Sequence, residues 1–208
     1  KSQSLEDLFQ YIALEVISKQ SHSVQTFLEQ SSILEELSGA ACDYVLNMEN
    51  AEGMLKNLAD KNMFIVPTRL NQYRHHALFK ELLENKLEET SPKEYRELSE
   101  RAAKYYERKE MFDQMLHYLV KSERYEDIAL FLQSYGFKLL KEGKLQTLYD
   151  FLRKIPIKLK EENYWLWFFE GELYRIRSEY KQAKACYYKA EELSGGCSDF
   201  RMNSLAHE

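Results

Sequence analysis

The sequence predicts a mainly α-helical protein with one small β-hairpin near residue 70. First, its 208 residues include only 7 Gly and 3 Pro. That is less than half of the ordinary share of about 12%, so turn-rich sandwiches, barrels and doubly wound sheets are disfavoured. Second, apolar residues recur at helical spacing along most of the chain. Third, the apolar run 63–66 has the character of a short strand.

The first sixty residues predict four short helices. Apolar residues in 5–19 follow a helical period behind Ser4, a preferred N-cap residue. A second helix is expected over 24–31. Two more helices are expected after Ser38 and after Asn50, which are also preferred N-cap residues.

A change of pattern follows these helices. The predicted strand 63–66 ends at Pro67, and after a polar turn a second strand is expected over 73–75. Helical spacing resumes over 77–87. Short helices followed by such a hairpin are typical of a winged-helix module, which we assign, with its preceding helix, to residues 1–90.

Paired helices are expected over the second domain, residues 91–208. Ser91 or its neighbour caps the first of them, with Pro92 near the first helical position. Further helices are expected over 125–133, 137–142 and 145–154.

The later helices carry the pattern of a tetratricopeptide repeat, which has a period of 34 residues. Small residues let the two helices of a repeat approach, and aromatic residues fill the gap between repeats. The matching residues are Trp167, Gly171, Tyr174, Ala183, Tyr187 and Ala190 in the last repeat, and Ala103 and Tyr106 in the first. Glu170 replaces the usual Leu, and the middle repeat matches poorly. We expect a tetratricopeptide-like α-superhelix that continues beyond this segment, because no capping helix follows Ser194.

Composition disfavours several functional classes. The formal charge of −5 is unlike that of a duplex-DNA binder. Cys42, Cys186 and Cys197 are far apart and form no CxxC pair, so we expect no disulfide or zinc site and a cytoplasmic protein. No run is long enough to span a membrane, and no signal peptide is evident. The start at Lys1 leads us to expect a piece of a longer protein.

The sequence contains no phosphate-cradling loop, GxSxG elbow or HExxH motif, so we do not expect an autonomous enzyme. Its best polar cluster is His75 with His76. The pair could pack locally, bind a metal or contact a nucleotide held by another domain; adjacent histidines normally diverge, which disfavours the metal. Arg69 and Arg74 could contact a DNA backbone, but solvated hairpin residues are the commoner explanation of such a pair.

The most aromatic stretch is NYWLWFF, residues 163–169. These rings cannot all face one side of a helix, so they either fill the repeat core or line a ligand or partner surface. The candidates for that surface are Tyr164, Trp165, Trp167 and Phe168.

Several stretches together resemble the middle of the MalT-type transcriptional regulators, the large ATP-dependent LuxR-family activators within the signal-transduction ATPases with numerous domains. The most specific stretches are LKNLADKNMFIVP and YRHHALFKELLENKL. LFQYIALEVISKQ, VQTFLEQSSILEELSGAACDYVL, LSERAAKYYERKEMFDQMLHYLVKSERYEDIALFL and GKLQTLYDFLRKIP extend the match over most of residues 5–190.

The resemblance implies a division of labour within a longer protein. An ATPase domain holding ADP or ATP precedes the winged helix, and a DNA-binding helix-turn-helix follows the sensor repeats. In this ATPase class a winged-helix histidine reaches the β-phosphate of ADP and holds the inactive state. The family pattern, roughly Tyr-His-His-Leu-Phe, aligns its first histidine with His76 and its second with Ala77. We therefore expect His76, with Arg74 beside it, to sense nucleotide bound by the ATPase domain.

In this interpretation the segment is non-catalytic and carries no cofactor of its own. Its partners are the ATPase domain of the same chain and an inducer or regulatory protein that binds the repeats. The alternative is a helical-repeat adaptor that binds protein partners without nucleotide switching. A third possibility is a direct DNA-binding winged helix, which the acidic neighbours of the helix before the hairpin disfavour.

Overall fold

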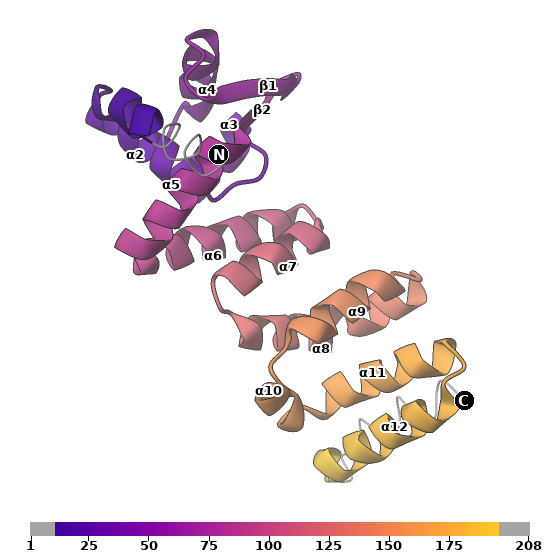
Figure 1. Ribbon diagram of the computed structural model, residues 1–208. Coiled ribbons are helices and arrows are strands. Elements are labelled where there is room, and N and C mark those ends of the chain that lie inside the picture. The colour runs from indigo at the N-terminus through magenta and orange to yellow at the C-terminus, as the bar shows by residue number, and fades with distance from the viewer. Residues whose placement is uncertain (1–10, 196–208) are drawn as a thin grey trace, which may run out of the picture. The chain divides into compact units, whose positions relative to one another are not determined.

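The computed structural model describes residues 11–195 and divides the chain into two compact units between Ser122 and Glu123 (Figure 1). In the first unit, residues 11–18 are helical. They are followed by α2 (His22–Ser31), α3 (Gly39–Leu46), α4 (Ala51–Asp60), β1 (Ile65–Arg69), β2 (Gln72–His75), α5 (Ala77–Thr90), α6 (Pro92–Arg108) and α7 (Phe112–Lys121). The second unit contains α8 (Tyr125–Lys141), α9 (Leu145–Lys154), α10 (Ile157–Glu161), α11 (Tyr164–Ile176) and α12 (Tyr180–Ser194).

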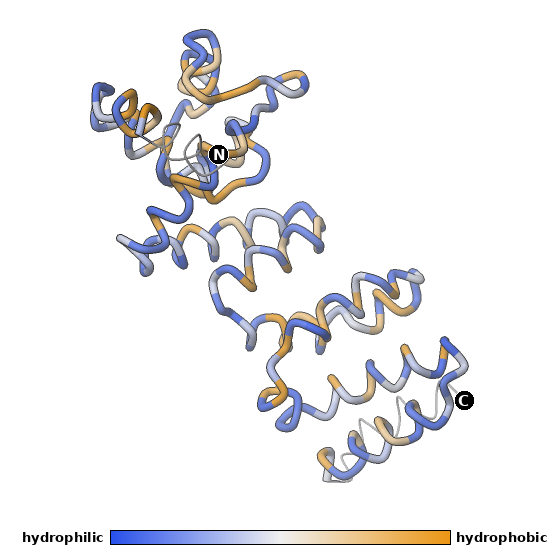
Figure 2. The backbone as a smooth tube through the Cα atoms, viewed as in Figure 1, coloured by the Kyte–Doolittle hydropathy of each residue, from blue (hydrophilic) through white to orange (hydrophobic). Residues whose placement is uncertain are grey.

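The predicted fold class is confirmed, with mainly helices and one antiparallel hairpin. Along the helices, hydrophobic and hydrophilic residues alternate as amphipathic packing requires (Figure 2). The expected domain boundary at residues 90/91 stays a prediction, because the compact units separate later and α6 and α7 lie in the first unit. The Ser4 cap and Cys197 fall outside the described residues.

The hairpin differs from its prediction at Pro67. This residue lies inside β1, opposite Tyr73, instead of ending the strand. The missing N–H of Pro67 is tolerated because the backbone of Tyr73 exchanges both its hydrogen bonds, each 2.8 Å, with Leu37 on its other side. Leu37 thus forms a short third bridge beside the hairpin.

Two predicted helix caps have different outcomes. The Ser38 hydroxyl accepts the N–H of Ala41 and caps α3 as expected. Asn50 stands at the N-cap of α4, but with a left-handed backbone, and its side chain makes no capping bond. The carboxylate of Asp43 accepts the N–H of Ala51 instead, at 2.8 Å, because the turn from α3 brings it over the start of α4.

The prediction of separate helices over 125–133 and 137–142 is wrong, because α8 is continuous from Tyr125 to Lys141. Gly136 lies inside it and leaves room for the buried ring of Phe169 on α11. A Cβ atom at Gly136 would lie 2.2 Å from that ring. The glycine therefore marks a close contact between helices and not a helix end.

The expected small and aromatic residues of the repeats lie at packing positions. In the last helix pair, a Cβ at Gly171 would lie 2.6 Å from the ring of Tyr187 on α12. Tyr174 is half-buried, whereas Ala183 and Ala190 are buried. In the α6–α7 pair the buried residues include Ala103, Tyr106 and Tyr118, and the two tyrosine rings stack 5.3 Å apart. These contacts agree with close helix pairing, and the tetratricopeptide assignment itself stays a prediction.

The described residues show two further features of the core. Cys42 and Cys186 are buried free thiols, and burial raises their pKa values to about 12 and about 11.

Within residues 11–195 no group of His, Cys, Asp and Glu could hold a metal ion. None of the described helices is both long and apolar enough to cross a bilayer.

Candidate functional site

The two adjacent histidines at the junction of β2 and α5 have opposite environments. His75 is buried in the core, and its Nε2 lies 3.0 Å from the Ser31 hydroxyl. Burial, together with the charge of Lys80, lowers the pKa of His75 to about 3, so its imidazole is neutral at physiological pH. His75 is therefore a structural residue.

His76 is exposed and stands at the N-cap of α5. Its backbone N–H donates to the Phe64 carbonyl at 2.8 Å, and its own carbonyl accepts the N–H groups of Phe79 and Lys80. Phe64 also stacks on Phe79, with ring centroids 4.0 Å apart. The backbone that carries the His76 side chain is thus fixed both to the strand β1 side and to α5.

Strand alternation places Arg74 on the same side of the chain as His76. Tyr73 and His75 are buried, whereas Arg74 and His76 are exposed. An exposed cation on β2 and an exposed imidazole at the N-cap of α5 therefore lie two residues apart in this module. A helix N-terminus favours anions, so this surface is chemically suited to a phosphate group.

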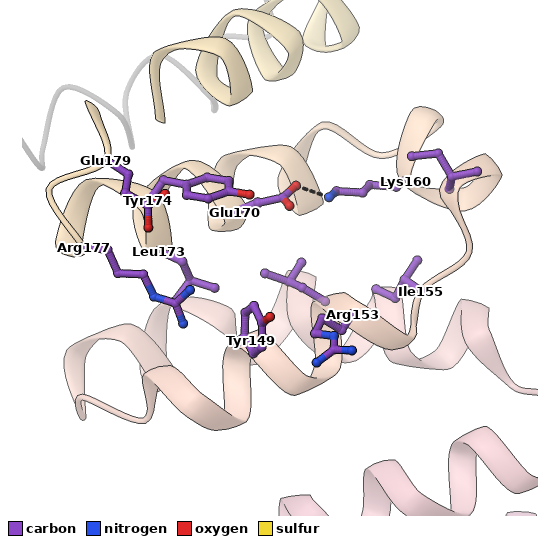
Figure 3. Close-up of a pocket in the computed structure, with 11 residues that line it drawn as sticks. Tyr149, Arg153, Ile155, Lys160, Glu170, Leu173, Tyr174, Arg177 and Glu179 are labelled. Carbon is purple, nitrogen blue, oxygen red and sulfur yellow. Dashed lines mark hydrogen bonds and ion pairs between the residues drawn. The ribbon is translucent and has the colours of Figure 1, made fainter. Parts of the chain in front are cut away.

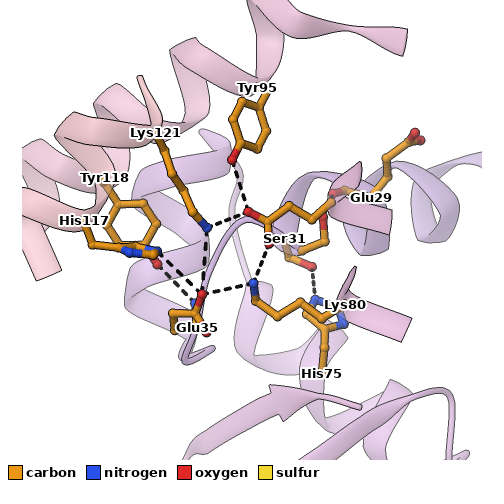
Figure 4. A network of polar contacts seen from close by, with 11 residues as sticks. Glu29, Ser31, Glu35, His75, Lys80, Tyr95, His117, Tyr118 and Lys121 are labelled. Atoms are coloured by element: carbon orange, nitrogen blue, oxygen red, sulfur yellow. Dashed lines mark hydrogen bonds and ion pairs between the residues drawn. The ribbon is translucent and has the colours of Figure 1, made fainter. Parts of the chain in front are cut away.

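The first unit contains a polar network that joins α5 to α6 and α7 (Figure 4). Its centre is the Glu84 carboxylate, whose side chain is 13% exposed. Glu84 accepts from Lys80 and Lys121 at 2.5 Å each and from the Tyr95 hydroxyl at 3.2 Å. The three donors come from α5, α6 and α7, so one largely buried carboxylate connects α5, which follows the hairpin, to the α6–α7 pair.

Glu35, in the loop after α2, extends this network. Its carboxylate lies 3.1 Å from Lys80, 3.6 Å from His117 and 3.8 Å from Lys121. The hydrogen bond with His117, followed by the charges of Lys80 and Lys121, lowers the pKa of Glu35 to about 2. Its backbone N–H donates to the Tyr118 hydroxyl at 3.1 Å.

The second unit contains a pocket of about 420 Å³ between α9, α10 and α11 (Figure 3). Tyr149 and Arg153 line one side, and Tyr174 and Arg177 belong to the other. The lining also includes Leu152, Ile155, Ile157, Lys160, Glu170, Leu173 and Glu179. The volume lies within the range of small-molecule sites, about 300 to 1,000 Å³.

The four aromatic residues predicted as surface candidates do not form one exposed surface. Trp165 and Phe168 are buried in a ring cluster with Phe137, so they belong to the core of the unit. Tyr164 and Trp167 are half-buried. The Trp167 ring lies 4.4 Å from Lys160, one of the pocket residues, and this stretch thereby borders the pocket without lining it.

The first module is similar to a known domain family. The family described as "MalT winged helix domain" matches residues 13–95. The matched segment contains the described residues from the first helix to the start of α6. His76 and Arg74 therefore lie inside the segment that is similar to the MalT winged helix domain, as does Glu84 at the centre of the polar network.

The similarity extends beyond the MalT winged helix domain. The HTH-type transcriptional regulator MalT of Vibrio parahaemolyticus is 26% identical over 187 residues, which cover 89% of this chain and 21% of the relative. MalT of Vibrio campbellii gives the same figures, and MalT of Vibrio cholerae is 28% identical over 68% of this chain and 16% of the relative. The chain thus spans about a fifth of the length of these relatives, and its resemblance to MalT-type regulators is confirmed.

The sequence motifs did not reveal several of the polar residues described above. Glu84 and Lys121 are 37 positions apart and meet only because α5 and α7 both pack against α6. Arg153 and Arg177 belong to different helix pairs and meet at one tyrosine ring.

Proposed function

We propose that this chain is a non-catalytic regulatory segment of an ATP-dependent transcriptional activator. In this account the MalT winged helix domain docks on the ATPase domain of the same polypeptide and contacts bound ADP through His76. The observation that carries the proposal is the exposed His76 at the N-cap of α5, within a MalT winged helix domain. The helix pairs that follow would bind an inducer or a regulatory protein.

Three features of His76 support a contact with phosphate. The side chain is exposed, and it projects beside the N-terminal amides of a 14-residue helix. Arg74 lies on the same side and adds a positive charge. The backbone bonds of His76 to Phe64 and to the first turn of α5 hold the donor in place, so little ordering is needed on docking.

The charge around α4, which precedes the hairpin, supports docking on protein over direct reading of DNA. Glu52 of this helix is committed to the Gly39 N–H, at 3.1 Å, and to the Tyr73 hydroxyl. Asp60, at its end, is exposed. A helix with these carboxylates would meet repulsion in a groove lined by phosphates. DNA binding is therefore assigned to a helix-turn-helix elsewhere in the longer protein.

The proposed switch between the inactive and active states depends on how tightly each state binds its ligands. ADP held between the ATPase domain and the winged helix stabilises a closed, inactive state. A ligand of the helix pairs activates the protein only to the extent that it binds the open state more tightly than the closed one. The open state then exchanges ADP for ATP and activates transcription.

A reporter assay in the full-length protein tests this role. We expect His76→Ala to raise transcription in the absence of inducer, because the closed state loses a contact that the open state lacks. His22→Ala is the matched control, since His22 is also exposed but lies at the start of α2. Unchanged basal transcription in both variants, with capture of a protein partner by the 208-residue chain alone, would instead favour the adaptor function.

A further inference from the structure

Two arginines flank a single tyrosine in the pocket of the second unit. The Cζ atom of Arg177 lies 4.8 Å from the centre of the Tyr149 ring, and that of Arg153 lies 5.5 Å from it. Figure 3 shows the two guanidinium groups on either side of this ring. Both side chains are exposed, and within the described part of the chain neither forms an ion pair with a carboxylate.

The two carboxylates that line the pocket have other partners. Glu170 forms an ion pair with Lys160 on the side of the pocket opposite Tyr149 and Arg153 (Figure 3). Glu179 accepts a hydrogen bond from the Gln182 amide at 3.2 Å. The lining carries three cationic side chains against these two carboxylates, so its balance is positive although the whole chain has a charge of −5.

We propose that this pocket binds a small organic anion, with Arg153 and Arg177 as the cationic groups that attract its carboxylate or phosphate. A guanidinium presents planar, paired donors that match the oxygens of either group. Leu152, Ile155 and Leu173 provide apolar lining against which a ring or short aliphatic body can pack. The inference deepens the proposed function and rests on it for the role of this ligand as an inducer.

Binding can be measured on the 208-residue chain itself. Its only two tryptophans, Trp165 and Trp167, both belong to the second unit, and Trp167 contacts Lys160 of the pocket. Tryptophan fluorescence therefore reports the titration. Benzoate and phenyl phosphate are the anionic probes and distinguish a carboxylate from a phosphate, benzyl alcohol is the neutral probe, and inorganic phosphate tests whether the apolar body contributes.

We expect saturable binding of benzoate or phenyl phosphate and weaker binding of benzyl alcohol. Arg153→Gln and Arg177→Gln should each weaken anion binding by about tenfold or more, as expected for loss of a hydrogen bond to a charged group. Arg153→Lys and Arg177→Lys keep the charge and should lose less. Arg124→Gln is the matched control, because Arg124 is in the same unit and pairs with Asp127 at 2.8 Å.

The proposal is overturned if neither anion gives a saturable response at about 10 mM. It is equally overturned if the glutamine variants, with unchanged circular dichroism, bind the anions as the unaltered chain does. The binding measurements use neither the ATPase domain nor the transcription reporter assay. Failure here therefore leaves the role of His76 open to its own test, and failure of that role leaves the anion site standing.

Discussion

Replacing Gly136 by alanine would put a methyl group into the space of an aromatic ring. The added Cβ would lie 2.2, 2.5 and 2.7 Å from three carbons of Phe169, where ordinary contacts are 3.4 to 4 Å. The ring is fully buried and also packs against Phe137 and Trp165, so it has little room to move. Either the ring or the separation of α8 and α11 must change.

The net effect follows from two opposing terms. Alanine gains about 1 kcal/mol over glycine in a helix interior. Overpacking a close-packed core costs about 1 to 3 kcal/mol, and the short approach to Phe169 puts this site at the upper end. We therefore expect Gly136→Ala to lower the free energy of unfolding of the second unit by about 2 kcal/mol.

Denaturation in urea followed by tryptophan fluorescence measures this value, because both tryptophans lie in the affected unit. Ser134→Ala, at an exposed position of the same helix, is the control and should change stability by no more than about 0.5 kcal/mol. Adding Phe169→Leu should relieve the clash, so the double variant should be more stable than the sum of the single effects predicts. A Gly136→Ala protein as stable as the unaltered chain, or more stable, would refute the packing argument.

Two further predictions concern the first unit. Glu84→Gln should lower the free energy of unfolding of this unit by about 2 to 4 kcal/mol, because two largely buried lysines lose the carboxylate that they share. Hydrogen exchange of the α5 and α6 backbone amides measures this loss. A double-mutant cycle with Lys121→Met should show a coupling energy between the two residues of about 1 kcal/mol or more. His75 has a folded-state pKa of about 3, below its unfolded value of about 6.5, so the unfolded chain binds more protons between these values. Stability should therefore fall as pH drops below about 6.5, by up to about 1.4 kcal/mol per pH unit, and His75→Gln should flatten this dependence while His22→Gln should not.

The hairpin and most helix positions could be predicted from the sequence because they depend on local pattern. The apolar run before Pro67 indicates a strand whatever lies beyond it, and Ser38 caps α3 through its own loop. The continuity of α8 could not be predicted in this way, because helical spacing does not show that Gly136 packs against Phe169, 33 positions away.

The candidate site shows the same limit. The resemblance to the family pattern points to His76, but it cannot show that the neighbouring His75 is the buried one, since that depends on Ser31, 44 positions earlier. For the aromatic stretch after Asn163 the sequence left the repeat core and a binding surface as alternatives, and only packing against Phe137 assigns Trp165 to the core. Long-range contacts of this kind leave no periodic signal in one sequence.

The most direct test of the account is the rate at which ADP leaves the full-length protein. Purified protein is loaded with a fluorescent ADP analogue and chased with unlabelled nucleotide, for the unaltered form and for His76→Ala and His22→Ala. The account predicts that His76→Ala releases the analogue at least about tenfold faster, as loss of a charge-assisted hydrogen bond to phosphate requires, and that His22→Ala does not. Equal release rates for all three proteins would contradict the nucleotide-sensing role of the MalT winged helix domain.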